Sequence, residues 1–77
     1  MNNHHVTVVV HIDEELPLQE RQILEADLAG SRGIHTARTN EQRQHLMLVD
    51  YDAGQVHSSQ LLNEVRQHGY HAQLVGW

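Results

Sequence analysis

Histidine is the residue type best suited to chemistry in this sequence, with eight copies in a chain of 77 residues that has no cysteine. Imidazole nitrogens bind Zn(II), Cu(II) and Ni(II), and a carboxylate can complete such a site. The lack of thiols excludes disulfides, thiolate catalysis and the soft ligands that Cu(I) favours. If the chain holds a metal, we expect a divalent ion bound by histidine and carboxylate side chains.

His11 and His71 are the two histidines expected to meet. Each lies at the end of a predicted strand, and the alternation of side chains places both on one face of the sheet. Antiparallel pairing of those strands would separate their Cβ atoms by about 5 Å. Asp13 and His68 lie at the same end of the molecule, and we predict a metal site formed by His11, His71, Asp13 and His68. The alternative is that all of these are ordinary exposed polar residues.

For the remaining histidines, the sequence gives weaker predictions about metal binding. The adjacent pair His4 and His5 would bind metals only adventitiously, and the other three are expected to face solvent: His35, His45 and His57. Protonation of every histidine would add eight positive charges to a formal charge of −5. Because unperturbed histidine titrates near pH 6.5, association or stability could change between about pH 7 and 5.5.

No catalytic constellation is present in the sequence. The serines at 31, 58 and 59 lack an acylation motif. The segment 30–33 follows a predicted helix instead of leading into one, so it does not form a phosphate cradle. The acidic run 13–15 is explained by the positive end of the helix that follows it. We therefore expect a protein that is not an enzyme.

Hydrophobic patterning predicts six elements that would position these residues. Strands are expected at 6–12, 34–39, 45–51 and 71–75, and helices at 18–29 and from 58 or 59 to 69. The order β-α-β-β-α-β predicts an α+β, ferredoxin-like sandwich. Its four-stranded antiparallel sheet would have the order 4-1-3-2, with two helices on one face. We expect one domain over residues 1–77, with its core at about 6–76.

The other face of this sheet would carry an apolar patch. Alternation turns Val9, Leu46, Leu48 and Val75 outward, with Trp77 nearby. Such a patch often marks an interface, either with another protein or with a second copy of the chain. The alternative is that Trp77 and the arginine stems fold over it.

The charge balance limits the class of partner. Five arginines and no lysine stand against ten acidic residues, so nucleic acid is not expected as a partner. No apolar run approaches the ~18 residues of a membrane span, and the start lacks the features of a signal peptide. We expect no membrane insertion and a cytoplasmic location.

Several stretches resemble heavy-metal-associated domains, the small copper- and zinc-handling modules of metallochaperones and metal-pumping ATPases. Leu24-Glu25-Ala26-Asp27-Leu28 and the following Gly33-Ile34 resemble that family's first helix and its exit. Val49-Asp50-Tyr51-Asp52 resembles its third strand and turn, and residues 56–76 resemble its second helix and last strand. The resemblance covers roughly residues 6–76 and implies a ferredoxin-like fold and a role in handling metals.

The family's Met-x-Cys-x-x-Cys loop is missing. Its methionine would fall at Glu15 and its cysteines at Pro17 and Glu20, so no thiol ligand carries over. Two functions remain open. One is metal binding or metal homeostasis through histidine and carboxylate ligands, with Zn, Cu(II) or Ni as the ion. The other is a metal-independent protein-interaction or regulatory module, dimeric through the open sheet face.

Overall fold

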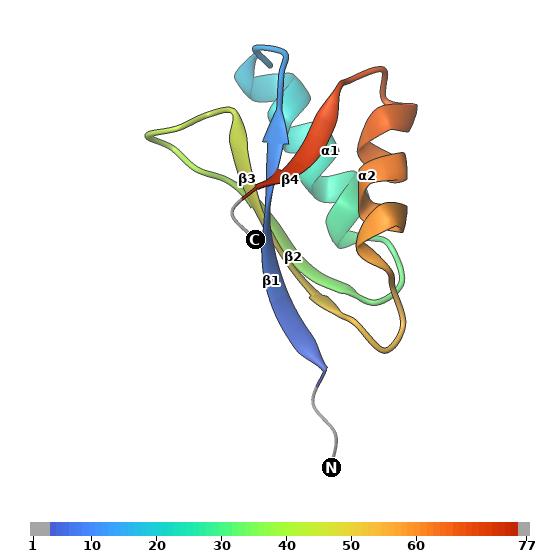
Figure 1. The fold of residues 1–77 in the computed structure, drawn as a ribbon. Coiled ribbons are helices and arrows are strands. Elements are labelled where there is room, and N and C mark those ends of the chain that lie inside the picture. The colour runs from blue at the N-terminus through green and yellow to red at the C-terminus, as the bar shows by residue number, and fades with distance from the viewer. Residues whose placement is uncertain (1–3, 76–77) are drawn as a thin grey trace.

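The computed structural model describes residues 4–75, which form a sheet covered by two helices (Figure 1). Its elements are β1 (His5–Ile12), α1 (Leu18–Ala29), β2 (Ile34–Thr39), β3 (Leu46–Asp52), α2 (Ser58–Gln67) and β4 (Ala72–Val75). The strands are antiparallel in the order β2-β3-β1-β4, and both helices cover the same face. Read from the other edge this order is 4-1-3-2, so the predicted α+β, ferredoxin-like fold is confirmed.

Alternation along the central strands builds the core. In β3, and in β1 from Val8 onward, every second residue turns towards the helices and is buried, as in Val10 and Val49, which have no exposed surface. Leu24 and Leu28 of α1 lie one turn apart and complete the core together with residues of α2. The intervening residues of β1 and β3 therefore face away from the helices, on the open side of the sheet.

The turns follow the positions of proline and glycine. Pro17, which has no backbone N–H, stands immediately before α1 instead of in its first turn. Gly33 and Gly69 adopt φ values of 87° and 92°, a backbone region that L side chains rarely occupy. Both lie where the chain leaves a helix and heads for the sheet, so glycine sets these two reversals.

Four strand boundaries differ from the prediction by one residue. The first strand begins at His5, not Val6, and the third ends at Asp52, not Tyr51. The third strand also begins at Leu46, not His45, and the fourth begins at Ala72, not His71. His45 and His71 therefore each lie one residue before a strand, where side chains do not have to alternate between the two faces of the sheet. Trp77, one of the predicted interface residues, lies outside the described residues.

The structure also bears on membrane insertion. Neither helix within residues 4–75 has the length and apolar character needed to cross a bilayer.

Candidate functional site

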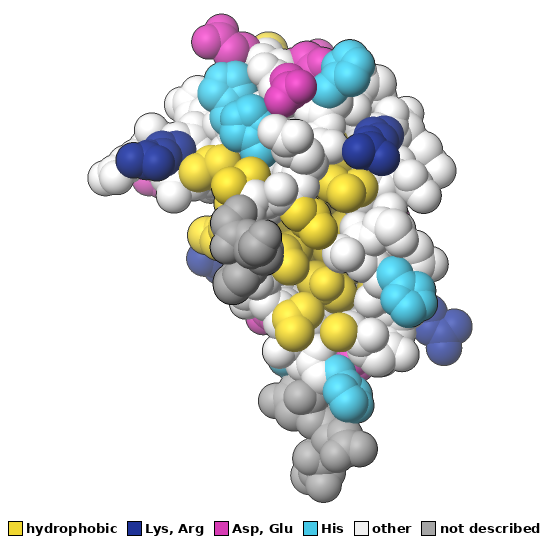
Figure 2. Space-filling view, viewed as in Figure 1, with side chains coloured by type: hydrophobic (Ala, Val, Ile, Leu, Met, Phe, Trp, Pro, Cys, Tyr) yellow, Lys and Arg dark blue, Asp and Glu magenta, His cyan; other side chains and the backbone are white. Residues whose placement is uncertain are grey.

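Histidine and acidic side chains gather at the end of the molecule where β1 finishes, beyond a band of hydrophobic side chains (Figure 2). Three histidines from different segments contribute: His11 from β1, His45 from the approach to β3 and His71 from the approach to β4. The strand ends meet here because β1 pairs with both β3 and β4. The sheet itself therefore positions this cluster, which we call the β1-end cluster.

Each of these three rings is anchored through its Nδ1 atom. Nδ1 of His11 lies 3.1 Å from Oδ1 of Asp13, and Nδ1 of His71 lies 2.6 Å from Oε2 of Glu14. Nδ1 of His45 lies 2.8 Å from the backbone carbonyl oxygen of Ile12. A carbonyl or an ionised carboxylate only accepts, so Nδ1 must carry the proton in each pair. In the neutral ring this leaves Nε2 with its lone pair, which is the form that binds a metal.

The predicted pairing of His11 with His71 is wrong by two residues. His11 lies opposite Gln73 in the β1–β4 ladder, and the backbone N–H of Asp13 donates to the carbonyl of His71 at 2.9 Å. His11 and His71 are thus diagonal neighbours, a relationship that separates Cβ atoms by about 7–8 Å. The two rings share an end and a face of the sheet without facing each other directly.

His68 lies apart from this cluster. Its Nε2 is 2.9 Å from Oδ2 of Asp27, and its ring stacks on Tyr70 with centroids 6.2 Å apart. Both contacts tie the C-terminal end of α2 to its surroundings, since Asp27 belongs to α1. The expectation that His68 joins His11, Asp13 and His71 is therefore not supported by its observed contacts.

His45 was expected to face solvent, yet it belongs to the cluster. Its ring stacks on that of His11, with centroids 5.8 Å apart and an interplanar angle of 17°. The β1–β3 register explains this, because His11 pairs with Leu46 and the N–H of Ile12 donates to the carbonyl of His45. Extending the predicted pairing of the first and third strands by one residue would have placed His45 beside the end of β1.

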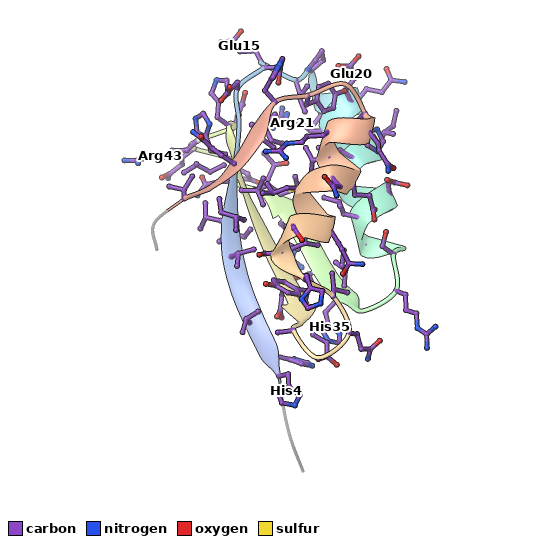
Figure 3. The ribbon with its side chains drawn as sticks, turned by 45° about the vertical axis from the view of Figure 1, so that its right-hand side comes forward. His4, Glu15, Glu20, Arg21, His35 and Arg43 are labelled. Carbon is purple, nitrogen blue, oxygen red and sulfur yellow. The ribbon has the colours of Figure 1, made fainter. Side chains whose placement is uncertain are left out.

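A cavity of about 490 Å³ opens next to His11 and His45. Glu15, from the loop before α1, and Arg43, from the loop before β3, both line it; Figure 3 labels the two residues. The guanidinium Nε of Arg21 donates to the carbonyl of Leu16 at 3.1 Å and so ties α1 to the loop. The cavity gives water and small ions access to the stacked rings.

Hydrogen bonds between Glu14 and His71, in the β1-end cluster, favour the charged forms of both side chains. Glu14 accepts both the ring N–H and the backbone N–H of His71, the latter at 2.8 Å. The ring hydrogen bond, followed by the backbone one, lowers the pKa of Glu14, and the same ring hydrogen bond to Glu14 raises the pKa of His71. The acidic run 13–15 thus holds the start of β4 in addition to lying before a helix.

No three histidine, aspartate or glutamate side chains within residues 4–75 stand close enough to share one ion. The β1-end cluster contains pairs: His11 with Asp13, His71 with Glu14, and His11 stacked on His45. An ion bound here would have to draw anchored rings together by rotation of their side chains.

Comparisons with known proteins bear on the scaffold. Neither a protein-family model nor a curated protein matches this sequence. Among solved structures, a copper-binding domain from HMA7, a P-type ATPase, shares 18% identity at a TM-score of 0.81, over 91% of this chain and 93% of that one. Oxidized MerP from Ralstonia metallidurans CH34 shares 11% identity at 0.82, over 94% and 99%. The chain has the fold of a heavy-metal-associated domain.

A third structure, the CopZ metallochaperone, shares 19% identity at a TM-score of 0.79, over 88% of this chain and all of that one. The resemblance expected from the sequence is thus confirmed for the fold, in a chain without cysteine. The three positions at which the family's thiol loop would fall have other roles in this structure. Pro17 precedes α1, Glu15 lines the cavity, and Glu20 is the acidic residue of the first turn of α1.

Proposed function

We propose that this protein is a small non-enzymatic domain of metal homeostasis that binds a divalent transition-metal ion at the β1-end cluster. The ligands are the Nε2 atoms of His11, His45 and His71, and the carboxylate of Asp13 supports the first of them. The observation that carries the proposal is the Nδ1 anchoring of all three rings. His68 is left out because its Nε2 already meets Asp27.

Nδ1 anchoring matters because a metal-binding histidine almost always donates its second ring N–H to a carboxylate or a carbonyl. That hydrogen bond fixes the tautomer, orients the ring and makes the ligand nitrogen more basic. Asp13 and Glu14 are ionised partners that also attract a cation, as does the formal charge of −5. Rotation of the stacked His11 and His45 rings would bring one nitrogen of each ring to within ~2.0–2.1 Å of a shared Zn(II) ion, the length of a Zn–N bond.

The ligand chemistry selects the ion. With no thiol in the chain, Cu(I) lacks its preferred ligands, whereas imidazole suits Zn(II), Cu(II) and Ni(II). The likeness in fold to a copper-binding domain and to a metallochaperone supports a role in handling metals. Location in the cytoplasm stays a prediction.

A titration of the metal-free protein with ZnCl2 at pH 7, followed by proton–nitrogen correlation NMR and calorimetry, tests the proposal. We expect saturable shifts at residues 11–15, 45 and 71, and an affinity at least about tenfold weaker in the His11→Gln, His45→Gln double variant. His68→Gln is the matched control and should bind as the wild type does. Unchanged shifts and affinity in the double variant would refute the site.

A second function, self-association through the open sheet face, is favoured by one row of side chains. Leu48, Val9 and Val75 lie directly opposite one another on three neighbouring strands, and no helix covers them. Leu48 is 42% exposed. Arg38 continues the row on β2 and Asp50 lies two residues from Leu48, so opposite charges flank the patch and could pair with a second copy. A stable interface buries ~800 Å² per partner, and this row consists of three apolar side chains, so we propose a weak homodimer.

A further inference from the structure

A second pair of histidines meets at the other end of the sheet. The rings of His5 and His35 lie in contact, with centroids 4.0 Å apart and planes inclined by 39°. Both residues are exposed. Figure 3 places His35 and His4 at the end of the molecule opposite Glu15. This pair is therefore separate from the β1-end cluster.

The sheet brings the two rings together across an intervening strand. His5 lies on β1 opposite Asp52 of β3, whereas His35 lies on β2, on the other side of β3. The β2–β3 register shifts between Ile34 and Thr36, so His35 is the extra residue of a β-bulge. A bulge redirects the side chain at the inserted position. Here it lets the His35 ring reach over β3 to His5.

Asp52, which lies opposite His5 in the β1–β3 ladder, supplies a negative charge at this end of the sheet. Its Oδ1 accepts the backbone N–H of Gly54 at 2.8 Å, and its Oδ2 accepts Nε2 of Gln55 at 3.0 Å. Both hydrogen bonds favour the ionised form of this carboxylate, which attracts a cation to this end.

We propose that His5 and His35, supported by the Asp52 carboxylate, bind a second divalent transition-metal ion. Two imidazole nitrogens in a tetrahedral site stand about 3.3 Å apart, a spacing that follows from Zn–N bonds of ~2.0–2.1 Å. The ring centroids are 4.0 Å apart, so rotation of the two side chains brings one nitrogen of each ring to this spacing. Within residues 4–75 the His35 ring forms no hydrogen bond that must first be broken. Water completes the coordination, and Asp52 contributes its negative charge without being a ligand.

The proposed sites at the two ends of the sheet give a stoichiometry of two ions per chain. Substitutions at one end should leave binding at the other end unchanged. The second site has fewer protein nitrogens than the first, so it fills at higher metal concentration. Nothing in this inference depends on the proposed function, because the two sites share no residue.

Paramagnetic Cu(II) tests the second site directly, because it broadens the NMR signals of nearby amides. We expect CuCl2 at pH 7 to broaden the amides of residues 5, 35 and 52 in the wild type. His35→Gln should abolish this broadening at residue 52 and weaken binding at this end at least tenfold. The same loss is expected in His5→Gln. The exposed His57 on the approach to α2 provides the matched control, and His57→Gln should behave as the wild type.

Two outcomes would overturn the inference. One is the absence of broadening at residues 35 and 52 in the wild type. The other is broadening around residues 4 and 5 that persists in full in His35→Gln, which would mean adventitious binding near the terminus. The His11→Gln, His45→Gln variant must retain the signal at residues 5, 35 and 52, since its loss there would show that only one site exists. A dispersed spectrum of each variant shows that it is folded.

Discussion

Replacement of Gly33 by alanine should destabilise the fold more than the same change at Gly69. Both glycines have positive φ, 87° and 92°, so alanine at either position carries the backbone strain of the left-handed region. This strain amounts to about 1–2 kcal/mol. The surroundings differ: a Cβ at Gly69 meets nothing within 4 Å, whereas a Cβ at Gly33 would lie 2.4 Å from Cγ2 of the buried Val56.

The packing conflict sets the size of the difference. Forcing an extra methyl group into a packed region costs about 1–3 kcal/mol. We therefore expect Gly69→Ala to lower the free energy of unfolding by about 1–2 kcal/mol and Gly33→Ala by about 2–5 kcal/mol. A domain of this size has a total of only about 4–12 kcal/mol, so Gly33→Ala removes a large part of it. The lost fraction should be visible in any equilibrium unfolding curve.

Urea unfolding followed by circular dichroism, together with thermal melts, measures both variants against the wild type. Each kcal/mol shifts the melting temperature by about 4–8 °C in a domain of this length. Equal losses in the two variants would refute the role of Val56, and a larger loss in Gly69→Ala would refute the packing argument altogether. Because the Gly33 carbonyl accepts the N–H of Asp52 at 2.8 Å, Gly33→Ala should also disturb the His5–His35 pair.

Two further predictions concern the Glu14–His71 pair and the open sheet face. The raised pKa of His71 gives stability that is complete below about pH 6.5 and is lost as the pH rises through its folded-state value. The lowered pKa of Glu14 gives stability that is present above about pH 4.5 and is lost as the pH falls through its folded-state value. In EDTA, the melting temperature of the wild type should thus exceed that of Glu14→Gln most between about pH 4.5 and 6.5, and a difference that is constant from pH 4 to 9 would contradict the pairing. Separately, sedimentation equilibrium should show weak self-association that Leu48→Gln abolishes; a wild type that stays monomeric at millimolar concentration would exclude the homodimer.

The fold was predictable because its signals are local. The β-branched run of β1, the leucines of α1 one turn apart and the terminating glycines each favour one structure, and their order leaves few topologies. Alternation then correctly assigned Leu48 to the open face, and its neighbours Met47 and Val49 are buried. A strand in a sheet with one buried face cannot slip by one residue without exposing its core residues.

The site was harder to predict because it depends on register between distant segments. A shift of two residues keeps every side chain on its predicted face, so the hydrophobic pattern does not oppose the pairing of His11 with Gln73 in place of His71. The bulge at His35 is likewise a feature of the register between β2 and β3. His45 is fixed by a hydrogen bond to Ile12, 33 positions away in the chain. The composition identifies histidine as the candidate ligand type, but the register between the strands determines which histidines lie close together.

At the proposed metal site, protons and metal ions would compete for the same imidazole nitrogens, and the Glu14–His71 pair gives this competition a direction. Below its raised pKa, His71 carries protons on both ring nitrogens, holds Glu14 most strongly and has no lone pair for a metal. Above that pKa, Nε2 becomes available while Nδ1–H still donates to Glu14. The carboxylate would thus make the ligand nitrogen more basic, so that this nitrogen keeps its proton to a higher pH. On this proposal, His71 holds the loop before α1 through Glu14 at mildly acidic pH and becomes a metal ligand as the pH rises.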